Sequence, residues 1–283
     1  MRNLLVLLAL AVVAGAADPK LDQAAALYHK TQYDAALRLL DGIQNKDAAA
    51  EFLLGRVLYG KGEYKESVEA FERAVALDPQ NSQYWDWLGK AYGSRAQKSS
   101  FLTAPKYALQ CRKAFEKAVE LDPKNLEALN EVFLYYLHAP GFLGGGVEKA
   151  VAISERLREL DPPAYHNTQA QLAKKRKDFE AAEQHLRNGV QAGSGKVGPL
   201  LDLASFLAER GRLQESDALF EKAQQMAPDD PEVMFARASS YVQFKRNLEE
   251  ARRLLNRYLT SELTPDNPSR DEAQELLRQA SSG

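Results

Sequence analysis

A pattern that recurs about every 34 residues limits the fold of this chain more than any other feature. Its clearest copy spans residues 48–81. Gly55 lies midway along a first apolar stretch, Gly62 breaks that stretch, and Phe71 lies in a second one that ends at Asp78-Pro79. Apolar residues in both stretches recur three or four positions apart, which is typical of amphipathic helices. The unit is therefore a predicted pair of helices joined by a tight turn.

The signal that ends the second helix recurs along the chain. Its copies are Leu77-Asp78-Pro79, Leu121-Asp122-Pro123, Leu160-Asp161-Pro162 and Met226-Ala227-Pro228. Proline disfavours helical geometry in the preceding residue, so each copy should end one helix, and proline then suits the first turn of the next. Small residues recur midway along the first helix, where they allow its partner to approach closely. These are Gly55, Gly89, Ala170, Ala204 and Ala238.

This pattern resembles the tetratricopeptide repeat. The resemblance covers nearly all of residues 18–265, which divide into about seven units: 18–46, 47–81, 82–125, 126–162, 163–196, 197–230 and 231–265. It implies an all-α fold, a right-handed superhelical solenoid of helix-turn-helix repeats. Residues 266–283 follow as a C-terminal capping helix and tail, and Ser269 and Glu272 have the spacing of a capping box that opens this helix. A terminal helix covers the open core of a solenoid.

Residues 1–17 have the layout of a cleavable signal peptide. Arg2 supplies a positive charge, an apolar run follows, and small residues end the segment at Ala16 and Ala17. A membrane anchor is the alternative, but the run is shorter than the ~20 residues that cross a bilayer. We therefore expect a periplasmic or secreted protein with no integral membrane span after signal removal. The single cysteine, Cys111, excludes an intramolecular disulfide.

Two units are lengthened between their first and second helices, at residues 97–106 and 139–146. Both insertions carry an aromatic residue beside proline, Phe101 in one and Phe142 in the other. Solvated loops have no need for such side chains. One interpretation is that the two loops pack on each other as a local core. The other is that they form a flap over a groove and contact a ligand there.

The sequence gives no sign of an enzyme. Its four histidines do not share i, i+4 spacing on one helix, and no nucleophile elbow or phosphate loop occurs. Repeats leave no room for a catalytic domain, so we expect no catalytic residues, no cofactor and no metal. A net charge of −2 argues against nucleic-acid binding, which needs a concentrated positive surface.

In proteins with this repeat, the first helices line a concave groove that binds a peptide or a helix. The position of each residue within its repeat identifies the residues that should face the groove, and each inserted loop adds one phenylalanine. The candidate partner-binding residues are Arg56, Tyr59, Asp86, Lys90, Asn130, Leu134, His138, Phe101 and Phe142. The family's best-known mode grips a terminal carboxylate with basic and amide side chains. Asp86 and Leu134 interrupt any such set here.

These candidate residues include charged, aromatic and amide side chains. Such a groove predicts a scaffold that binds a protein or peptide partner, within a cell-envelope assembly. The alternative is a periplasmic ligand-binding or transport accessory protein whose two inserted loops cover the groove and hold a small molecule. A deep apolar pocket that joins Phe101, Phe142, Trp87 and Tyr135 would favour this alternative.

Overall fold

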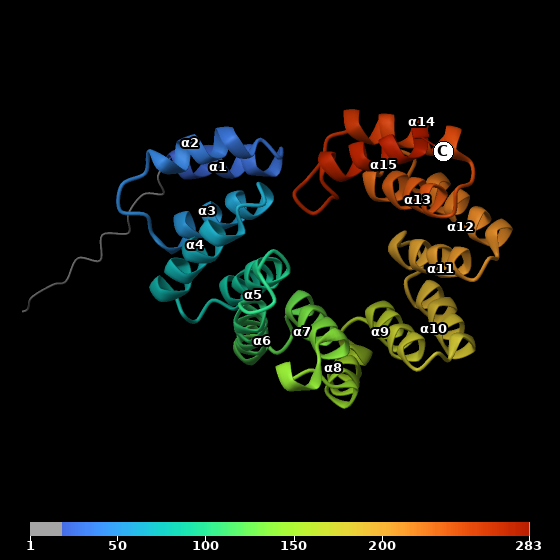
Figure 1. Cartoon of the computed structure of the whole chain (residues 1–283), viewed down its shortest axis with the longest axis horizontal. Coiled ribbons are helices and arrows are strands. Elements are labelled where there is room, and N and C mark those ends of the chain that lie inside the picture. The colour runs from blue at the N-terminus through green and yellow to red at the C-terminus, as the bar shows by residue number, and fades with distance from the viewer. Residues whose placement is uncertain (1–18, 283) are drawn as a thin grey trace, which may run out of the picture.

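The computed structural model describes residues 19–282, and these fold into helices that pair in order along the chain (Figure 1). The seven pairs are α1 (Pro19–His29) with α2 (Tyr33–Asp41), α3 (Ala48–Gly60) with α4 (Tyr64–Leu77), α5 (Ser82–Gln97) with α6 (Ala104–Leu121), α7 (Leu126–His138) with α8 (Val147–Leu160), α9 (Pro162–Lys175) with α10 (Phe179–Ala192), α11 (Gly198–Glu209) with α12 (Leu213–Met226), and α13 (Pro231–Gln243) with α14 (Leu248–Thr260). A short 3₁₀ helix, η1 (Gly141–Leu143), precedes α8, and α15 (Arg270–Ser282) follows the last pair. The predicted all-α solenoid of about seven hairpins is confirmed.

The predicted signal peptide, residues 1–17, lies outside the described residues. Within residues 19–282, no helix combines the length and the apolar character needed to cross a bilayer.

Aspartate and asparagine side chains fix where several of the helices begin. Asp47, Asn125 and Asp161 each accept a hydrogen bond from a backbone N–H in the first turn of the following helix, at 2.9, 3.0 and 3.2 Å. Asp161 also ends α8, so one residue joins two hairpins. At the start of α15, Ser269 N donates to Glu272 Oε2 and Glu272 N donates to Ser269 Oγ. The predicted capping box is present.

In the second and third hairpins, the two helices meet where a glycine faces a phenylalanine. A Cβ atom added to Gly55 would lie 2.6 Å from ring carbons of Phe71, and one added to Gly89 would lie 2.5 Å from those of Phe115. Phe71 is fully buried in this contact. The glycines therefore set the distance between the paired helices, as the repeat pattern predicts.

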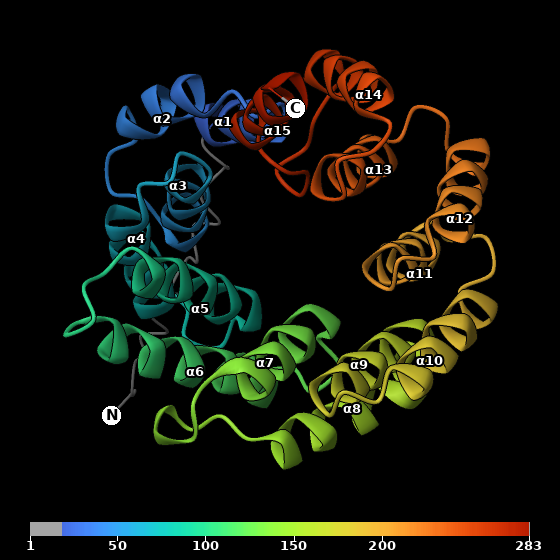
Figure 2. The ribbon, with the colours of Figure 1, turned by 45° about the vertical axis from the view of Figure 1, so that its right-hand side comes forward.

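The hairpins follow a curved path, so that the solenoid forms a nearly closed ring (Figure 2). The first helix of each pair lies on the inner side of the ring and the second on the outer side (Figure 2). The capping segment returns to the first hairpin, where Arg270 Nη1 donates a hydrogen bond to Thr31 Oγ1 at 2.9 Å. Arg270 Nη2 also donates to the carbonyl oxygen of Ser261, which fixes the arginine to the C-terminal end. A cleft of about 680 Å³ lies along this seam.

The inserted loops do not form the local core that one interpretation expects, and that prediction is wrong. Phe101 is 84% exposed, Leu102 is 75% exposed and Phe142 is 80% exposed. The second loop instead packs on α6, where the guanidinium of Arg112 lies against Gly144. Gly144 has a φ of +88°, a conformation that glycine adopts without steric cost. Phe101, Leu102 and Phe142 are thus exposed on the surface of the described residues, whereas Leu143 is half-buried.

Substituting Gly55→Ala should lower the free energy of unfolding, measured by urea denaturation. Overpacking against Phe71 costs about 1–3 kcal/mol, which outweighs a gain of up to about 1 kcal/mol in helix propensity. The control is Gly198→Ala, because a Cβ atom there meets nothing within 4 Å. A Gly55→Ala protein more stable than the wild type would contradict this packing.

Substituting Arg270→Ala should open the ring, because it removes the hydrogen bond to Thr31. Double electron–electron resonance between spin labels on Lys30→Cys and Gln274→Cys would measure the distance across the seam. Cys111 is buried and should not react. We expect a longer, broader distance distribution in the Arg270→Ala protein, and no change with Arg278→Ala, whose guanidinium pairs with Glu275 within α15. Identical distributions would show that Arg270 does not hold the ring closed.

Candidate functional site

Side-chain contacts join successive first helices along the inner side of the ring, and we call this surface the inner face. Tyr59 hydroxyl lies 3.0 Å from Ser94 Oγ, and Lys174 Nζ donates to Glu209 Oε2 at 2.8 Å. The remaining contacts of this kind are Arg56 Nε to Tyr28 Oη at 3.1 Å, Lys90 to Glu127, and Asn167 Nδ2 to Asp202 Oδ2 at 2.6 Å. Partners in these pairs are 28 to 37 residues apart, about one repeat. The repeat length therefore places polar side chains of neighbouring units side by side.

Three of the predicted residues gather around Trp87 on α5. The Arg56 guanidinium lies 4.7 Å from the Trp87 ring centroid, and Lys90 Nζ lies 4.8 Å from it. Tyr59 meets the same ring edge to face, with centroids 5.6 Å apart. Cations attract the face of an aromatic ring, so both basic side chains are held at fixed positions. The structure brings Arg56, Tyr59 and Lys90 together at the inner face of α3 and α5.

Asp86 and Lys90 belong to a cluster in which carboxylates outnumber cations. Lys90 Nζ lies 3.1 Å from Asp86 Oδ2 and 4.0 Å from Glu131 Oε1, and it also pairs with Glu127. Asp86 is 1% exposed, and neither of its carboxylate oxygens has a hydrogen-bond partner. Lys90 is thus paired with three carboxylates, and these four residues have a net charge of −2 when all of them are ionised.

Burial raises the pKa of Asp86 to about 6, and the charge of Lys90 opposes this only in part. Burial also raises the pKa of Glu131, again against the charge of Lys90. Lys90 itself has a raised pKa, because its carboxylate neighbours outweigh its own burial. Lys90 therefore remains protonated at neutral pH, whereas Asp86 and Glu131 lose their protons at a higher pH than exposed carboxylates do.

A cleft of about 340 Å³ opens beside this cluster. Lys90 and Glu131 supply its charged wall, and Tyr59, Leu134 and Tyr135 supply apolar and aromatic surface. Cys111 lines its base and is buried. Burial, with the charges of Glu131 and Asp86 added, raises the pKa of the Cys111 thiol to about 12. The thiol is therefore un-ionised at neutral pH and is a packing residue here.

The other predicted residues are more scattered. Asn130 and His138 are exposed on α7, and Leu134 between them is half-buried in the cleft wall. Phe101 and Phe142 lie on exposed loops. Trp87 is buried, so the deep apolar pocket that would join it to these phenylalanines is absent from the described residues.

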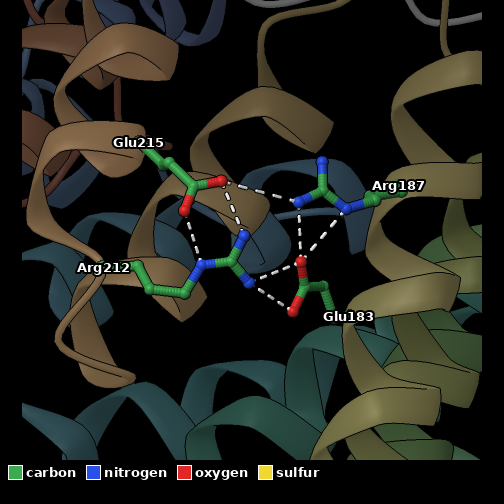
Figure 3. Close-up of polar contacts among 4 residues, drawn as sticks. All are labelled: Glu183, Arg187, Arg212 and Glu215. Atoms are coloured by element: carbon green, nitrogen blue, oxygen red, sulfur yellow. Dashed lines mark hydrogen bonds and ion pairs between the residues drawn. The ribbon is translucent and has the colours of Figure 1, made fainter.

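One charged network was missed by sequence reasoning. Arg212, in the turn before α12, donates to both carboxylate oxygens of Glu183 on α10 and to Glu215 on its own helix, at 2.6–2.7 Å (Figure 3). Arg187 completes the network through Glu183 (Figure 3). Burial opposes ionisation of Glu183, but hydrogen bonds from Arg187 and Arg212 prevail and hold its pKa below the usual value.

The same arrangement joins other neighbouring hairpins. Lys61 pairs with Asp34 at 2.8 Å, and Arg246 pairs with Asp217, 29 residues earlier. In each case a basic residue in or near the turn of one hairpin meets an acidic residue near the start of the previous hairpin's second helix. A search for such pairs 27 to 29 residues apart could have found them. They hold the hairpins in register and are structural in role.

Asp86→Asn should change how stability depends on pH. Free aspartate ionises near pH 4, so between about 4 and 6 the folded wild type binds more protons than the unfolded chain. The wild type therefore loses stability relative to Asp86→Asn as the pH rises through this window. Urea unfolding of both proteins, below about pH 4 and above about pH 6, measures how the difference between their free energies of unfolding changes across this window. Parallel stability curves would contradict a raised pKa at Asp86.

Arg212 and Glu183 should be coupled in a double-mutant cycle with Arg212→Ala and Glu183→Gln. Because the network is partly exposed, we expect a small favourable coupling energy at low salt. Screening by about 1 M salt should reduce it. Urea denaturation of the four proteins provides the measurement, and a coupling energy of zero would mean that the network does not hold α10 to α12.

Family models match much of the chain. A model described as "TPR repeat" matches residues 55–94, and one described as "Tetratricopeptide repeat" matches residues 167–231 and 201–268. Among curated proteins, none matches the sequence.

Solved structures share the fold at low sequence identity. A tetratricopeptide repeat protein from Parabacteroides merdae is 13% identical with a TM-score of 0.59, over 93% of this chain and 97% of that one. The thermophilic TPR protein TTC0263 from Thermus thermophilus is 21% identical with a TM-score of 0.50, over 79% and 97%. The APC/C hetero-tetramer Cut9–Hcn1 gives 15% identity and a TM-score of 0.51, over 94% of this chain and 49% of that one.

Proposed function

This chain belongs to the tetratricopeptide repeat family, and on that premise we propose that it is a non-enzymatic scaffold that binds a protein or peptide partner on its inner face. The tetratricopeptide fold supports a protein–protein interaction scaffold in general, and the family is generally non-catalytic. One of the structures with this fold is a hetero-tetramer of two proteins. We propose no cofactor, metal or nucleic acid as a ligand.

The observation that carries this proposal is the organisation of the inner face. Polar and aromatic side chains from successive first helices converge there, and several are held by their neighbours. Arg56 is fixed between Tyr28 and Trp87, with centroid distances of 4.5 and 4.7 Å. Side chains already held in place lose less entropy when a partner binds. The outer helices instead carry ion pairs that are satisfied within the chain, such as those of Arg212.

We propose further that the protein is exported and acts in the periplasm or outside the cell, in a cell-envelope assembly. The support is the sequence of residues 1–17, which has the charged, apolar and small-residue order of a signal peptide. Mass spectrometry of the protein purified from its own cells tests this. We expect a mature N-terminus after Ala16 or Ala17, and an intact Met1 would count against export.

The alternative function, a ligand-binding or transport accessory protein with its loops closed over a groove, has less support. Phe101 and Phe142 are more than three-quarters exposed and do not cover the cleft beside Glu131. Small-molecule sites bury most of their ligand in a largely preformed pocket. With neither phenylalanine over it, the cleft of about 340 Å³ is not enclosed in this way.

A photo-crosslinking amino acid placed at Asn130 tests the proposed function. Asn130 is exposed on α7, among the inner helices, whereas Lys113 is exposed on α6, among the outer helices. In intact cells, the protein labelled at position 130 should give discrete crosslinked partners that the protein labelled at position 113 lacks. Equal crosslinking at both positions would contradict an inner binding face.

A further inference from the structure

The carboxylates of the chain divide between the two layers of the ring. Among residues 19–282, the carboxylates with a raised pKa are all on first helices: Asp86, which is buried, Glu131, which is half-buried, and Asp202 and Glu232, which are exposed. Five have a lowered pKa because basic or amide side chains bond to them, and all five are on second helices or α15: Asp34, Glu183, Glu215, Glu250 and Glu275. These outer carboxylates accept hydrogen bonds from donors within the chain, whereas Asp86 and Glu131 share the single cation of Lys90.

Contacts on the inner face show the same shortage of positive charge. Lys90 is shared by Asp86, Glu127 and Glu131. Its Nζ lies 3.1 Å from Asp86 Oδ2 as an ion pair, and no hydrogen-bond donor among the described residues is assigned to either buried carboxylate oxygen of Asp86. Asp202 accepts its hydrogen bond from the neutral amide of Asn167. A buried carboxylate that shares its one cation with two other carboxylates is only partly compensated, so the cluster around Lys90 is prepared to accept further positive charge.

The cleft beside Glu131 has the composition of a site for one cationic side chain. Glu131 supplies a carboxylate whose nearest cation, Lys90, is 4.0 Å away. The rings of Tyr59 and Tyr135 supply aromatic walls, which attract ammonium and guanidinium groups. Asp86 and Glu131 both act on the thiol of Cys111 at the base of the cleft, so their negative charge reaches its interior.

We infer that the partner is a basic segment, and that one of its arginine or lysine side chains enters the cleft between α5, α6 and α7 to pair with Glu131. This inference rests on the proposed function and names the partner's chemistry. Further basic side chains of the segment would meet the carboxylates of α11 and α13 around the ring. An acidic segment, or a terminal carboxylate, would face like charges at the same positions.

Fluorescence anisotropy with labelled peptides of matched length tests the inference. The probes are repeats of Arg-Ala-Gly, of Gln-Ala-Gly and of Glu-Ala-Gly. We expect the arginine peptide to bind and the other two to bind at least tenfold more weakly, with an affinity that falls as salt increases. Glu131→Gln should weaken the arginine peptide by about tenfold, because it removes a partly buried charge pair.

The matched control is Glu159→Gln, the same change on the exposed outer surface of α8, which should leave binding unchanged. Glu131→Lys should shift the preference toward the glutamate peptide, and thermal unfolding of each variant checks that it folds. Equal affinity for all three peptides, or wild-type binding by Glu131→Gln, would overturn the inference. Crosslinking at Asn130 decides separately whether the inner face binds a partner of other chemistry.

Discussion

The close contact of a glycine with a phenylalanine ring, seen inside the second and third hairpins, is the interaction on which the rest of the structure depends. Gly55 against Phe71 and Gly89 against Phe115 bring the paired helices so near that no side chain fits between them. Each hairpin buries only part of its apolar surface, and the next hairpin covers the remainder. Repetition of one packing distance, with Asp-Pro connectors such as Asp161-Pro162, then gives a regular curvature that carries the chain round into a ring (Figure 2).

That curvature also separates two chemical environments. Exposed side chains of the second helices lie on the outer side, where Arg212 and its neighbours satisfy one another and keep adjacent hairpins in register. Side chains on first helices face the inner side, where protein surrounds Asp86 and Glu131 without enough cations to pair with them. Carboxylates with raised pKa values that share one lysine beside a cleft are a reason to look for a ligand. The same geometry that stabilises the solenoid therefore produces its binding surface.

The fold could be predicted from the sequence because its determinants are local and repeated: helix periodicity, helix-ending signals and small residues at fixed positions. The positions of Arg56, Tyr59 and Lys90 within their repeats were also enough to predict that they lie on one surface. Other features depend on contacts between residues that are far apart in the sequence, or on how a loop lies on the folded surface. The seam between Thr31 and Arg270 joins residues 239 positions apart, and nothing near either residue indicates it. The exposure of Phe101 depends on how a loop lies on the folded surface, which periodicity does not describe.

Hydrogen–deuterium exchange, measured with and without the arginine peptide, tests most directly whether the inner face is the binding surface. Backbone amides in α5 and α7 should exchange more slowly when the peptide is bound, because its contacts oppose local opening of the helices that it touches. Those in α4, α10 and α12 should exchange at unchanged rates. Protection confined to the outer helices or to the loop around Phe101 would contradict the account.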